Sequence, residues 1–210
     1  ASDVYKRQVQ KVLNGEEERV VDIRPHEKGE RFEELPMDKF AEHTRAFVKV
    51  EDGCNRRCAY CVIPRARGPV RSRDEASVLE ELHRLSDAGY KEVVLTAISL
   101  PSYGTDSGTS LVELIEKAAE VPGIERIRLG SLDPDMLHDE DILRMAGVKK
   151  LCPQFHLSLQ SGCDKTLRAM RRPYTTAQYA DIAAKLREAF GAEKVSFTTD
   201  VIVGFPGETE

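Results

Sequence analysis

From residue 45 onward, short apolar runs of strand length alternate with stretches of helical periodicity, and this alternation limits the possible folds more than any other feature. Parallel strands that are joined by crossover helices produce such a sequence. The last apolar run is nearly continuous, which is typical of a parallel strand that is buried on both faces. The strands are expected at residues 46–50, 93–98, 126–130, 155–159 and 195–203.

Helices are expected between these strands. Residues 75–85 carry apolar side chains at helical spacing and are followed by Gly89, which suits a helix C-cap. The candidate caps or first residues of the later helices are Ser110, Asp139 and Thr175 or Thr176. Five strand–helix repeats, with a sixth missing, predict an α/β fold that is either an open doubly wound sheet or a partial barrel. In both folds, ligands bind where the carboxyl ends of the strands meet the loops.

The first 44 residues are polar and irregular, and they contain too few apolar side chains to form a core of their own. We therefore divide the chain into residues 1–44, a linker or a remnant of a preceding domain, and residues 45–210, the α/β domain. The chain begins without Met and stops directly after the last apolar run. We interpret it as a fragment that is cut on both sides.

Composition excludes several classes of protein. Lys and Arg number 31 against 36 for Asp and Glu, which gives a net charge of −5, so the chain as a whole is not a polycation. No apolar stretch reaches the ~20 residues that span a membrane, and no signal peptide begins the chain. We expect a cytoplasmic protein without a membrane partner. Five cysteines is an odd number for a disulfide framework, which favours metal or redox chemistry.

Three of these cysteines follow the first expected strand within eight residues. Cys54, Cys58 and Cys61 have the spacing Cys-x3-Cys-x2-Cys and stand on a loop, where three thiolates can converge on one centre. A structural zinc ion needs a fourth ligand, which would have to be Cys152, His156 or another distant residue. A 4Fe-4S cluster accepts three protein ligands and leaves one iron open to a small molecule.

This loop, with an aromatic residue directly before its third cysteine, resembles the radical S-adenosylmethionine (radical SAM) superfamily. The resemblance implies a partial (βα)6-type barrel, here truncated after about five strands and preceded by an irregular N-terminal segment. It also implies a 4Fe-4S cluster that is held by Cys54, Cys58 and Cys61. The open iron of that cluster binds S-adenosylmethionine, and reductive cleavage yields methionine and a 5′-deoxyadenosyl radical.

Further motifs resemble the methylthiotransferases of this superfamily, which insert sulfur into an unactivated C–H bond and methylate it. The matching stretches are residues 43–50, 67–73, 151–164 and 199–209. Stretch 151–164, together with residues 170–174, is most similar to the enzymes that act on N6-threonylcarbamoyladenosine beside the tRNA anticodon. The enzymes for isopentenyladenosine in tRNA and for a ribosomal-protein aspartate are close relatives and remain alternatives.

The resemblance also implies positions that bind the cofactor. They are Tyr60, Gln160, Ser161, Ile202 and Gly204, although Ile202 can equally be a core residue. Methylthiotransferases use a second 4Fe-4S cluster, which their N-terminal domain holds, and the first 53 residues here contain no cysteine. That cluster is therefore expected only in a missing N-terminal domain, and the two remaining cysteines, Cys152 and Cys163, are expected to be buried or structural.

Arginines crowd the cysteine loop and the segment that follows it. Six of them lie between residues 56 and 73 with no acidic residue among them. Guanidinium groups suit phosphate oxygens, so Arg65, Arg67, Arg71 and Arg73 are candidate contacts to tRNA. The alternative is a solvated loop whose arginines pair with acids of the next helix at positions 75, 80 and 81, and Arg71 or Arg73 can also serve the cofactor.

The functional hypothesis is a radical SAM tRNA methylthiotransferase that thiomethylates N6-threonylcarbamoyladenosine next to the anticodon. An electron donor such as flavodoxin or ferredoxin would reduce the cluster. The chain alone, without a second cluster, is not expected to complete the reaction. An alternative of another class is a zinc-stabilised, nonenzymatic RNA-binding domain.

Overall fold

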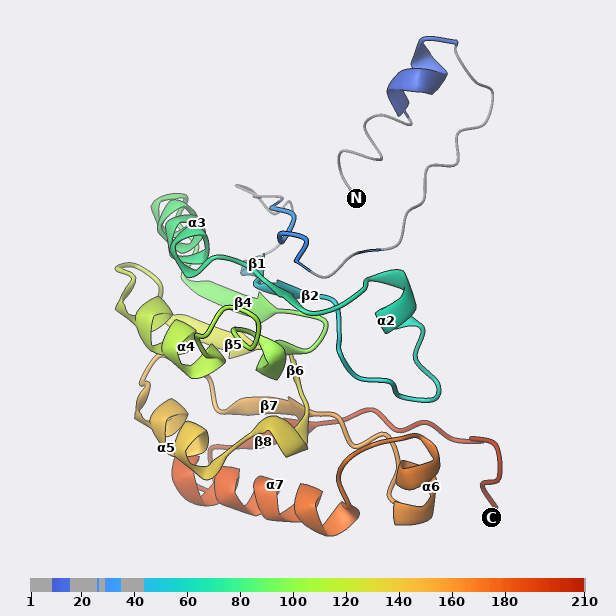
Figure 1. Ribbon diagram of the computed structural model, residues 1–210. Helices are drawn as coiled ribbons and strands as arrows, with labels where there is room; N and C mark the ends of the chain where they lie inside the picture. The colour runs from blue at the N-terminus through green and yellow to red at the C-terminus, as the bar shows by residue number, and fades with distance from the viewer. Residues whose placement is uncertain (1–8, 16–25, 27–28, 35–43, 210) are drawn as a thin grey trace.

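The computed structural model describes residues 9–15, 26, 29–34 and 44–209. The elements alternate along the chain between strands and helices (Figure 1). The strands are β1 (Ala46–Lys49), β2 (Glu51–Asp52), β3 (Arg71–Ser72), β4 (Glu92–Thr96), β5 (Arg126–Leu129), β6 (Ser131–Leu132), β7 (Gln154–Leu157) and β8 (Ser196–Thr198). The helices are α2 (Ile63–Ala66), α3 (Glu75–Asp87), α4 (Leu111–Glu120), α5 (Asp139–Gly147), α6 (Asp164–Ala169) and α7 (Thr176–Phe190), with 3₁₀ turns η1 (Leu100–Ser102) and η2 (Pro134–Met136).

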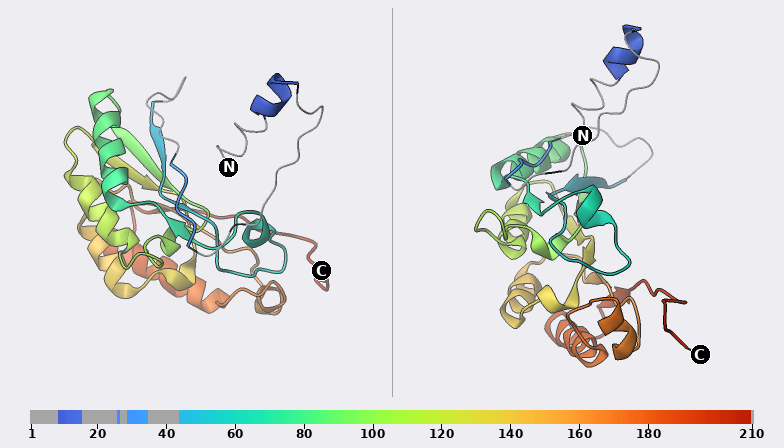
Figure 2. Two further views of the ribbon diagram at one scale, coloured as in Figure 1. Left: turned by 45° about the horizontal axis from the view of Figure 1, so that its top comes forward. Right: turned by 45° about the vertical axis from the view of Figure 1, so that its right-hand side comes forward.

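The main strands run parallel in chain order. One sheet has the order β1-β4-β5 and a second has the order β6-β7-β8, and the bridge between Ile127 and Leu151 connects the two. Helices α3, α4, α5 and α7 follow one another along one side of this curved surface (Figure 2). Among the described residues, the two sheets do not close into a barrel. This arrangement confirms the predicted partial barrel.

Local sequence signals explain where the helices begin. Ser110 and Thr175 each form a capping box, in which the cap side chain accepts a hydrogen bond from the amide of the third helical residue and the cap amide donates one to the side chain of that residue. Asp74 caps α3, and α5 begins at Asp139 with three acidic residues in its first turn, where they interact favourably with the helix dipole. The helix starts that the sequence predicted are confirmed, with Thr175 as the cap of α7.

The hydrophobic core lies between the sheet and its helices. Along β1, Ala46 and Val48 are buried while Phe47 and Lys49 are exposed, which is the period-two pattern of a strand. From the helix side, Leu82 and Ile115 are fully buried against it. Each such side chain contributes roughly 2 kcal/mol by leaving water. The core thus fixes the strands, and the strands fix the positions of the loops at their carboxyl ends.

The strand expected at residues 195–203 is present but shorter, and the expectation that it is buried on both faces is wrong. β8 has only three residues, its burial pattern is exposed, intermediate, exposed, and Val201 and Val203 are 54% and 83% exposed. β8 pairs with β7 on one side only, and no other strand of the described chain pairs with its second side. An apolar run is buried on both faces only where neighbouring elements cover it, and these elements are not part of the run itself.

Residues 26 and 29–34, which we assigned to a separate segment, lie against the domain. Glu34 accepts a hydrogen bond from the Ser77 hydroxyl at 2.7 Å, and the Lys49 ammonium lies 5.6 Å from the ring centre of Phe32. The rest of residues 1–44, apart from residues 9–15 and 44, falls outside the described residues. No helix in the described part of the chain is long and apolar enough to span a membrane.

Candidate active site

The cysteine loop begins at a glycine that no other residue could replace. Gly53 has a φ of 87°, and a Cβ there would collide with the carbonyl oxygen of Pro69. The antiparallel pair β2–β3 closes the base of the loop, with Glu51 opposite Ser72 and Asp52 opposite Arg71. The loop therefore leaves the carboxyl edge of the sheet on a rigid stem.

Asp52 holds this stem together electrostatically. Its carboxylate accepts hydrogen bonds from the Gly53 amide at 2.8 Å and from the Lys49 ammonium at 2.7 Å. Arg67 and Arg71 each lie 3.6 Å from Oδ2, the oxygen that accepts from Lys49. Burial alone would raise the pKa of Asp52, but the Lys49 hydrogen bond and the surrounding charges lower it overall. Asp52 is thus a charged anchor directly before the first loop cysteine.

The three loop cysteines are free thiols that are neither fully buried nor fully exposed. The Cys54 sulfur accepts the Arg56 amide at 3.4 Å, and burial raises the pKa of that thiol. The Cys58 sulfur accepts a hydrogen bond from Arg172 Nη1 at 3.5 Å, and the Cys61 amide donates to the Cys58 carbonyl at 3.1 Å. Within the described residues, no three His, Cys, Asp or Glu side chains form a group that could hold a metal ion.

The donor set fits an iron–sulfur cluster in its chemistry and its place. A cluster of several irons takes each thiolate on a different iron, so its three ligands need not lie within reach of a single ion. Free thiols on a rigid stem at the carboxyl edge of parallel strands, with amide and guanidinium donors aimed at two of the sulfurs, suit ligands that become thiolates.

Arg172 is a buried cation beside the loop, and sequence reasoning did not select it. Its guanidinium forms an ion pair with Asp133, donates from Nε to the Tyr174 hydroxyl at 3.1 Å, and lies 4.8 Å from the centre of the Tyr174 ring. Although burial lowers the pKa of Arg172, Asp133 and Cys58 raise it overall. The motif at residues 170–174 is the sequence signal that could have identified Arg172. Asp133 could have been identified because it directly follows a strand.

A second buried carboxyl group, that of Glu51, lies below the loop. Its Oε2 accepts the Ser99 amide at 2.9 Å, while its Oε1 has no hydrogen-bond partner among the described residues. Burial raises the pKa of Glu51 to about 7. Glu51 thereby supports the loop after β4.

Of the predicted cofactor-binding residues, the structure joins Gln160 and Ile202 by a hydrogen bond and places Tyr60 beside Cys58. Tyr60 is 37% exposed and interacts through its hydroxyl with Cys58, whereas the Ile202 amide donates to the Gln160 carbonyl at 2.8 Å. Gln160 itself adopts a φ of 66°. The side chain of Ser161 accepts the Cys163 amide at 3.2 Å and is buried.

Gly204 and the two cysteines outside the loop, Cys152 and Cys163, differ in their exposure. Gly204 is exposed, with open space around it. Cys152 is partly buried before β7. Cys163 is exposed at the start of α6, so of the two expected roles, buried or structural, the buried one is wrong for Cys163.

The arginines that were predicted to contact tRNA fall into two classes. Arg71 and Arg73 are 5% and 4% exposed. Arg71 donates to the carbonyls of Arg67 and Pro69, and Arg73 pairs with Glu81. For Arg73, the structure confirms the alternative prediction, in which an arginine of this segment pairs with an acidic residue of the next helix. Arg65 and Arg67 have exposed side chains.

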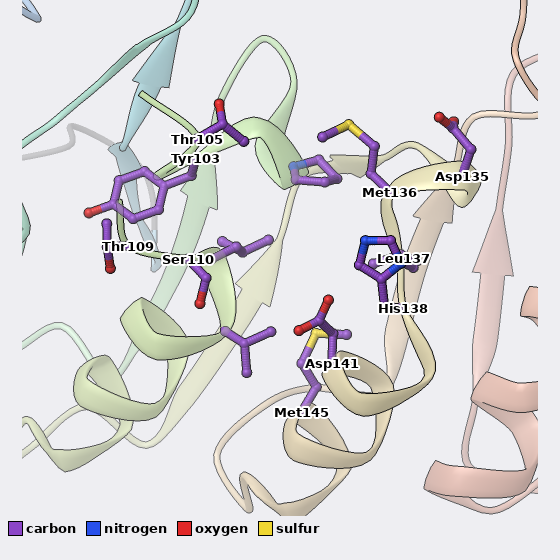
Figure 3. Close-up of a pocket in the computed structure, with 13 residues that line it drawn as sticks. Tyr103, Thr105, Thr109, Ser110, Asp135, Met136, Leu137, His138, Asp141 and Met145 are labelled. Carbon is purple, nitrogen blue, oxygen red and sulfur yellow. The ribbon is translucent and has the colours of Figure 1, made fainter. Parts of the chain in front are cut away.

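A pocket of about 250 Å³ lies between the start of α4 and the start of α5 (Figure 3), and none of the three loop cysteines lines it. Apolar side chains such as Met136, Leu137 and Met145 line much of it, together with Ser110 and Asp141. None of the residues that we predicted to bind a cofactor, metal or tRNA lines this pocket.

Residues 48–210 match the family model for the radical SAM superfamily.

Curated relatives have names that refer to tRNA. A threonylcarbamoyladenosine tRNA methylthiotransferase from Chlamydia pneumoniae is 42% identical over 85% of this chain and 42% of its own length. One of the same name from Thermotoga maritima is 40% identical over 94% of this chain and 44% of its own length. A tRNA-2-methylthio-N(6)-dimethylallyladenosine synthase from Acetivibrio thermocellus is 43% identical over 79% of this chain and 35% of its own length. The chain thus spans less than half the length of these relatives.

Solved structures share the fold. A radical S-adenosylmethionine methyltransferase from Kitasatospora setae, with cobalamin and a [4Fe-4S] cluster bound, superimposes with a TM-score of 0.63 and 20% identity, over 78% of this chain and 32% of the other. Coproporphyrinogen III oxidase from Escherichia coli superimposes with a TM-score of 0.53 and 14% identity, over 80% of this chain and 40% of the other.

Proposed function

This chain belongs to the radical SAM superfamily and, within it, to the methylthiotransferases, and we propose that it is the part of a tRNA methylthiotransferase that binds and cleaves S-adenosylmethionine. The observation that carries the proposal is the loop of Cys54, Cys58 and Cys61 on its stem at the carboxyl edge of the sheet. Active sites of parallel barrels form at that edge.

The cofactors are a 4Fe-4S cluster and S-adenosylmethionine. The three loop cysteines would hold the cluster, which, when bound, supplies the electron that cleaves S-adenosylmethionine to a 5′-deoxyadenosyl radical. In this proposal Tyr60, Gln160 and Ile202 contact S-adenosylmethionine. Ile202 contributes through its backbone, which is hydrogen-bonded to that of Gln160, and Gly204, which has no side chain, leaves open space nearby. Ser161 acts indirectly, because its hydroxyl already orders the start of α6.

The proposed substrate is N6-threonylcarbamoyladenosine next to the tRNA anticodon. Support comes from the motifs at residues 151–164 and 170–174 and from relatives that carry this substrate in their names at 40–42% identity. A relative named for dimethylallyladenosine is 43% identical, so the choice between the two nucleosides rests on the motifs. Arg65 and Arg67 are the arginines proposed to meet tRNA phosphates, because Arg71 and Arg73 are engaged inside the protein.

The remaining parts of the proposal concern the whole protein. Residues 45–210 form the radical SAM domain and residues 1–44 precede it as a linker or remnant. A second cluster, held by another part of the protein, would supply sulfur. A low-potential donor such as flavodoxin or ferredoxin would reduce the first cluster, and such chemistry suits the cytoplasm.

Anaerobic reconstitution of the chain tests the cofactor. We expect about four iron and four sulfide per chain. One zinc per chain without iron or sulfide would instead favour a nonenzymatic, zinc-stabilised RNA-binding domain. A chain that carries the cluster should cleave S-adenosylmethionine without forming a methylthio product.

Analysis of modified nucleosides tests the substrate. In a strain that lacks the full-length gene, tRNA should lose the methylthio form of N6-threonylcarbamoyladenosine and keep the unthiolated nucleoside. Loss of the methylthio form of isopentenyladenosine would assign the other tRNA substrate. An unchanged tRNA profile would remove the tRNA substrate altogether and direct attention to the ribosomal-protein aspartate.

A further inference from the structure

We propose that Arg172 is a positioning residue that fixes the cysteine loop and donates a hydrogen bond to the Cys58 sulfur, and that it thereby raises the reduction potential of the cluster. This inference rests on the proposed function, because it needs Cys58 to be a cluster ligand. It concerns the contact between Arg172 and one particular sulfur, 114 residues away in the sequence.

All three nitrogens of the Arg172 guanidinium have a partner. Nη2 pairs with Asp133, Nη1 donates to the Cys58 sulfur at 3.5 Å, and Nε donates to the Tyr174 hydroxyl at 3.1 Å. The side chain is only 4% exposed. A planar group with fixed donors, held on three sides, has little freedom to turn away from the sulfur.

The partners of Arg172 are themselves fixed. The Tyr174 hydroxyl donates to backbone carbonyls at the end of β7, including that of Leu159 at 2.9 Å. The carbonyl of Met170 accepts the Ala59 amide of the cysteine loop at 3.0 Å. The segment between α6 and α7 thus contacts the loop at two successive residues, Cys58 through a side chain and Ala59 through the backbone.

The charges around Arg172 are balanced before any cofactor is added. Arg56 lies 3.6 Å from Asp133 and donates to Asp135 at 2.6 Å, so two arginines face two aspartates. A thiolate-bound cluster brings additional negative charge, which increases when the cluster is reduced. A buried cation that donates to a ligand sulfur stabilises the more negative state, and this raises the reduction potential.

The neighbouring arginine provides a matched control. Arg171 has a φ of 60° and an exposed side chain, whereas Arg172, the next residue, is buried. Arg172→Gln and Arg171→Gln therefore remove the same charge from adjacent positions. Arg172→Lys keeps the charge but loses the planar fork. Thermal unfolding of each variant shows whether it folds.

Hydrogen exchange tests the positioning without any cofactor. In the chain without a cluster, Arg172→Gln should accelerate hydrogen exchange of the Ala59 amide at least tenfold, while Arg171→Gln should leave the exchange rate unchanged. Equal exchange in the two variants would overturn the positioning role.

Reconstitution tests the effect on the cluster. With equal iron and sulfide content, Arg172→Gln should have a lower midpoint potential than the wild type and an altered EPR spectrum, Arg172→Lys should lie between them, and Arg171→Gln should match the wild type. If Arg172→Gln takes up no cluster, Arg172→Lys decides: an intermediate potential supports the proposal, and a wild-type potential overturns it. If the wild type itself takes up no iron and sulfide, the proposed function fails, and this outcome is distinct from either result for Arg172.

Discussion

The two edges of the parallel sheet use the same types of residue in different ways. At the carboxyl edge, Asp133 and Arg172 form an ion pair whose side chains are 13% and 4% exposed, and this pair joins loops that are far apart in the sequence. At the amino edge, Glu92 pairs with Arg126 and Arg128 on the neighbouring strand and with Arg45, and these arginines are 29–53% exposed.

The two carboxylates are equally shielded, since the Glu92 side chain is 12% exposed, so the edges differ in whether the arginine is shielded from water. A buried pair costs desolvation and needs good geometry to form, so it orders its surroundings, whereas an exposed pair is screened and contributes little. In barrels of parallel strands, the carboxyl edge carries the chemistry and the amino edge carries stability. The four predictions below test whether this division holds.

The largest effect is expected from the thiols. Cys54→Ser, Cys58→Ser or Cys61→Ser should each prevent stable uptake of the cluster, because a hydroxyl is a poor replacement for a thiolate ligand of iron. Iron and sulfide analysis after anaerobic reconstitution measures this effect. Cys152, which precedes β7 at the amino edge, provides the control, and Cys152→Ser should retain the cluster. A Cys152 variant that loses the cluster while Cys61→Ser retains it would contradict the assignment of the edges.

The next effect concerns the buried pair. Asp133→Asn removes the charge that faces Arg172 and Arg56, and leaving a buried cation without its partner costs about 3–5 kcal/mol of unfolding free energy. Urea denaturation near neutral pH measures the loss. Glu92→Gln is the matched variant at the other edge. Equal losses for the two variants would remove the contrast between the edges.

A smaller, pH-dependent effect is expected at Glu51. Its pKa is raised from 4.5 to about 7 by burial, so the folded chain binds a proton at this carboxyl more tightly than the unfolded chain does. Stability therefore falls as the pH rises from about 4.5 to about 7, by on the order of 3 kcal/mol. Glu51→Gln lacks this titration and can still accept the Ser99 amide. Urea denaturation of both proteins should show the variant gaining relative stability over this range, and a constant difference would contradict the raised pKa.

The parts of the fold that the sequence predicted are those that local signals determine. Ser110 and Thr175 carry their capping partners three residues later, and the alternation along β1 can be read from four consecutive residues. The β2–β3 pair was not predicted because it consists of two-residue strands with mostly charged side chains. The exposure of Val203 was not predicted because it depends on neighbours that the run itself does not contain.

The same distinction applies to the site. The cysteine loop was recognisable because its three thiols are close in sequence. Asp133 and Arg172 are 39 residues apart, and only the tertiary fold, which places the segment between α6 and α7 beside the residue that follows β6, brings them together. The number of arginines between residues 56 and 73 could be counted, but the burial of Arg71 and Arg73 could not, because it depends on where the chain turns back at β3.

The smallest effect is expected at the amino edge. Hydrogen bonds from Arg126 and Arg128 lower the pKa of Glu92 below its usual 4.5, so the charged carboxylate stabilises the fold fully above that pH. Glu92→Gln should therefore lose stability near neutral pH, and the loss should shrink as the pH falls below 4.5 and the wild-type carboxyl takes up a proton. Because water screens the arginines, the loss near neutral pH should stay under about 1 kcal/mol and shrink as salt is raised. Urea denaturation at low and high salt measures it, with Arg126→Gln in the Glu92→Gln background adding no further loss. A salt-independent loss as large as that of Asp133→Asn would mean that this edge also shields its charges from water, and the contrast between the edges would then have another cause.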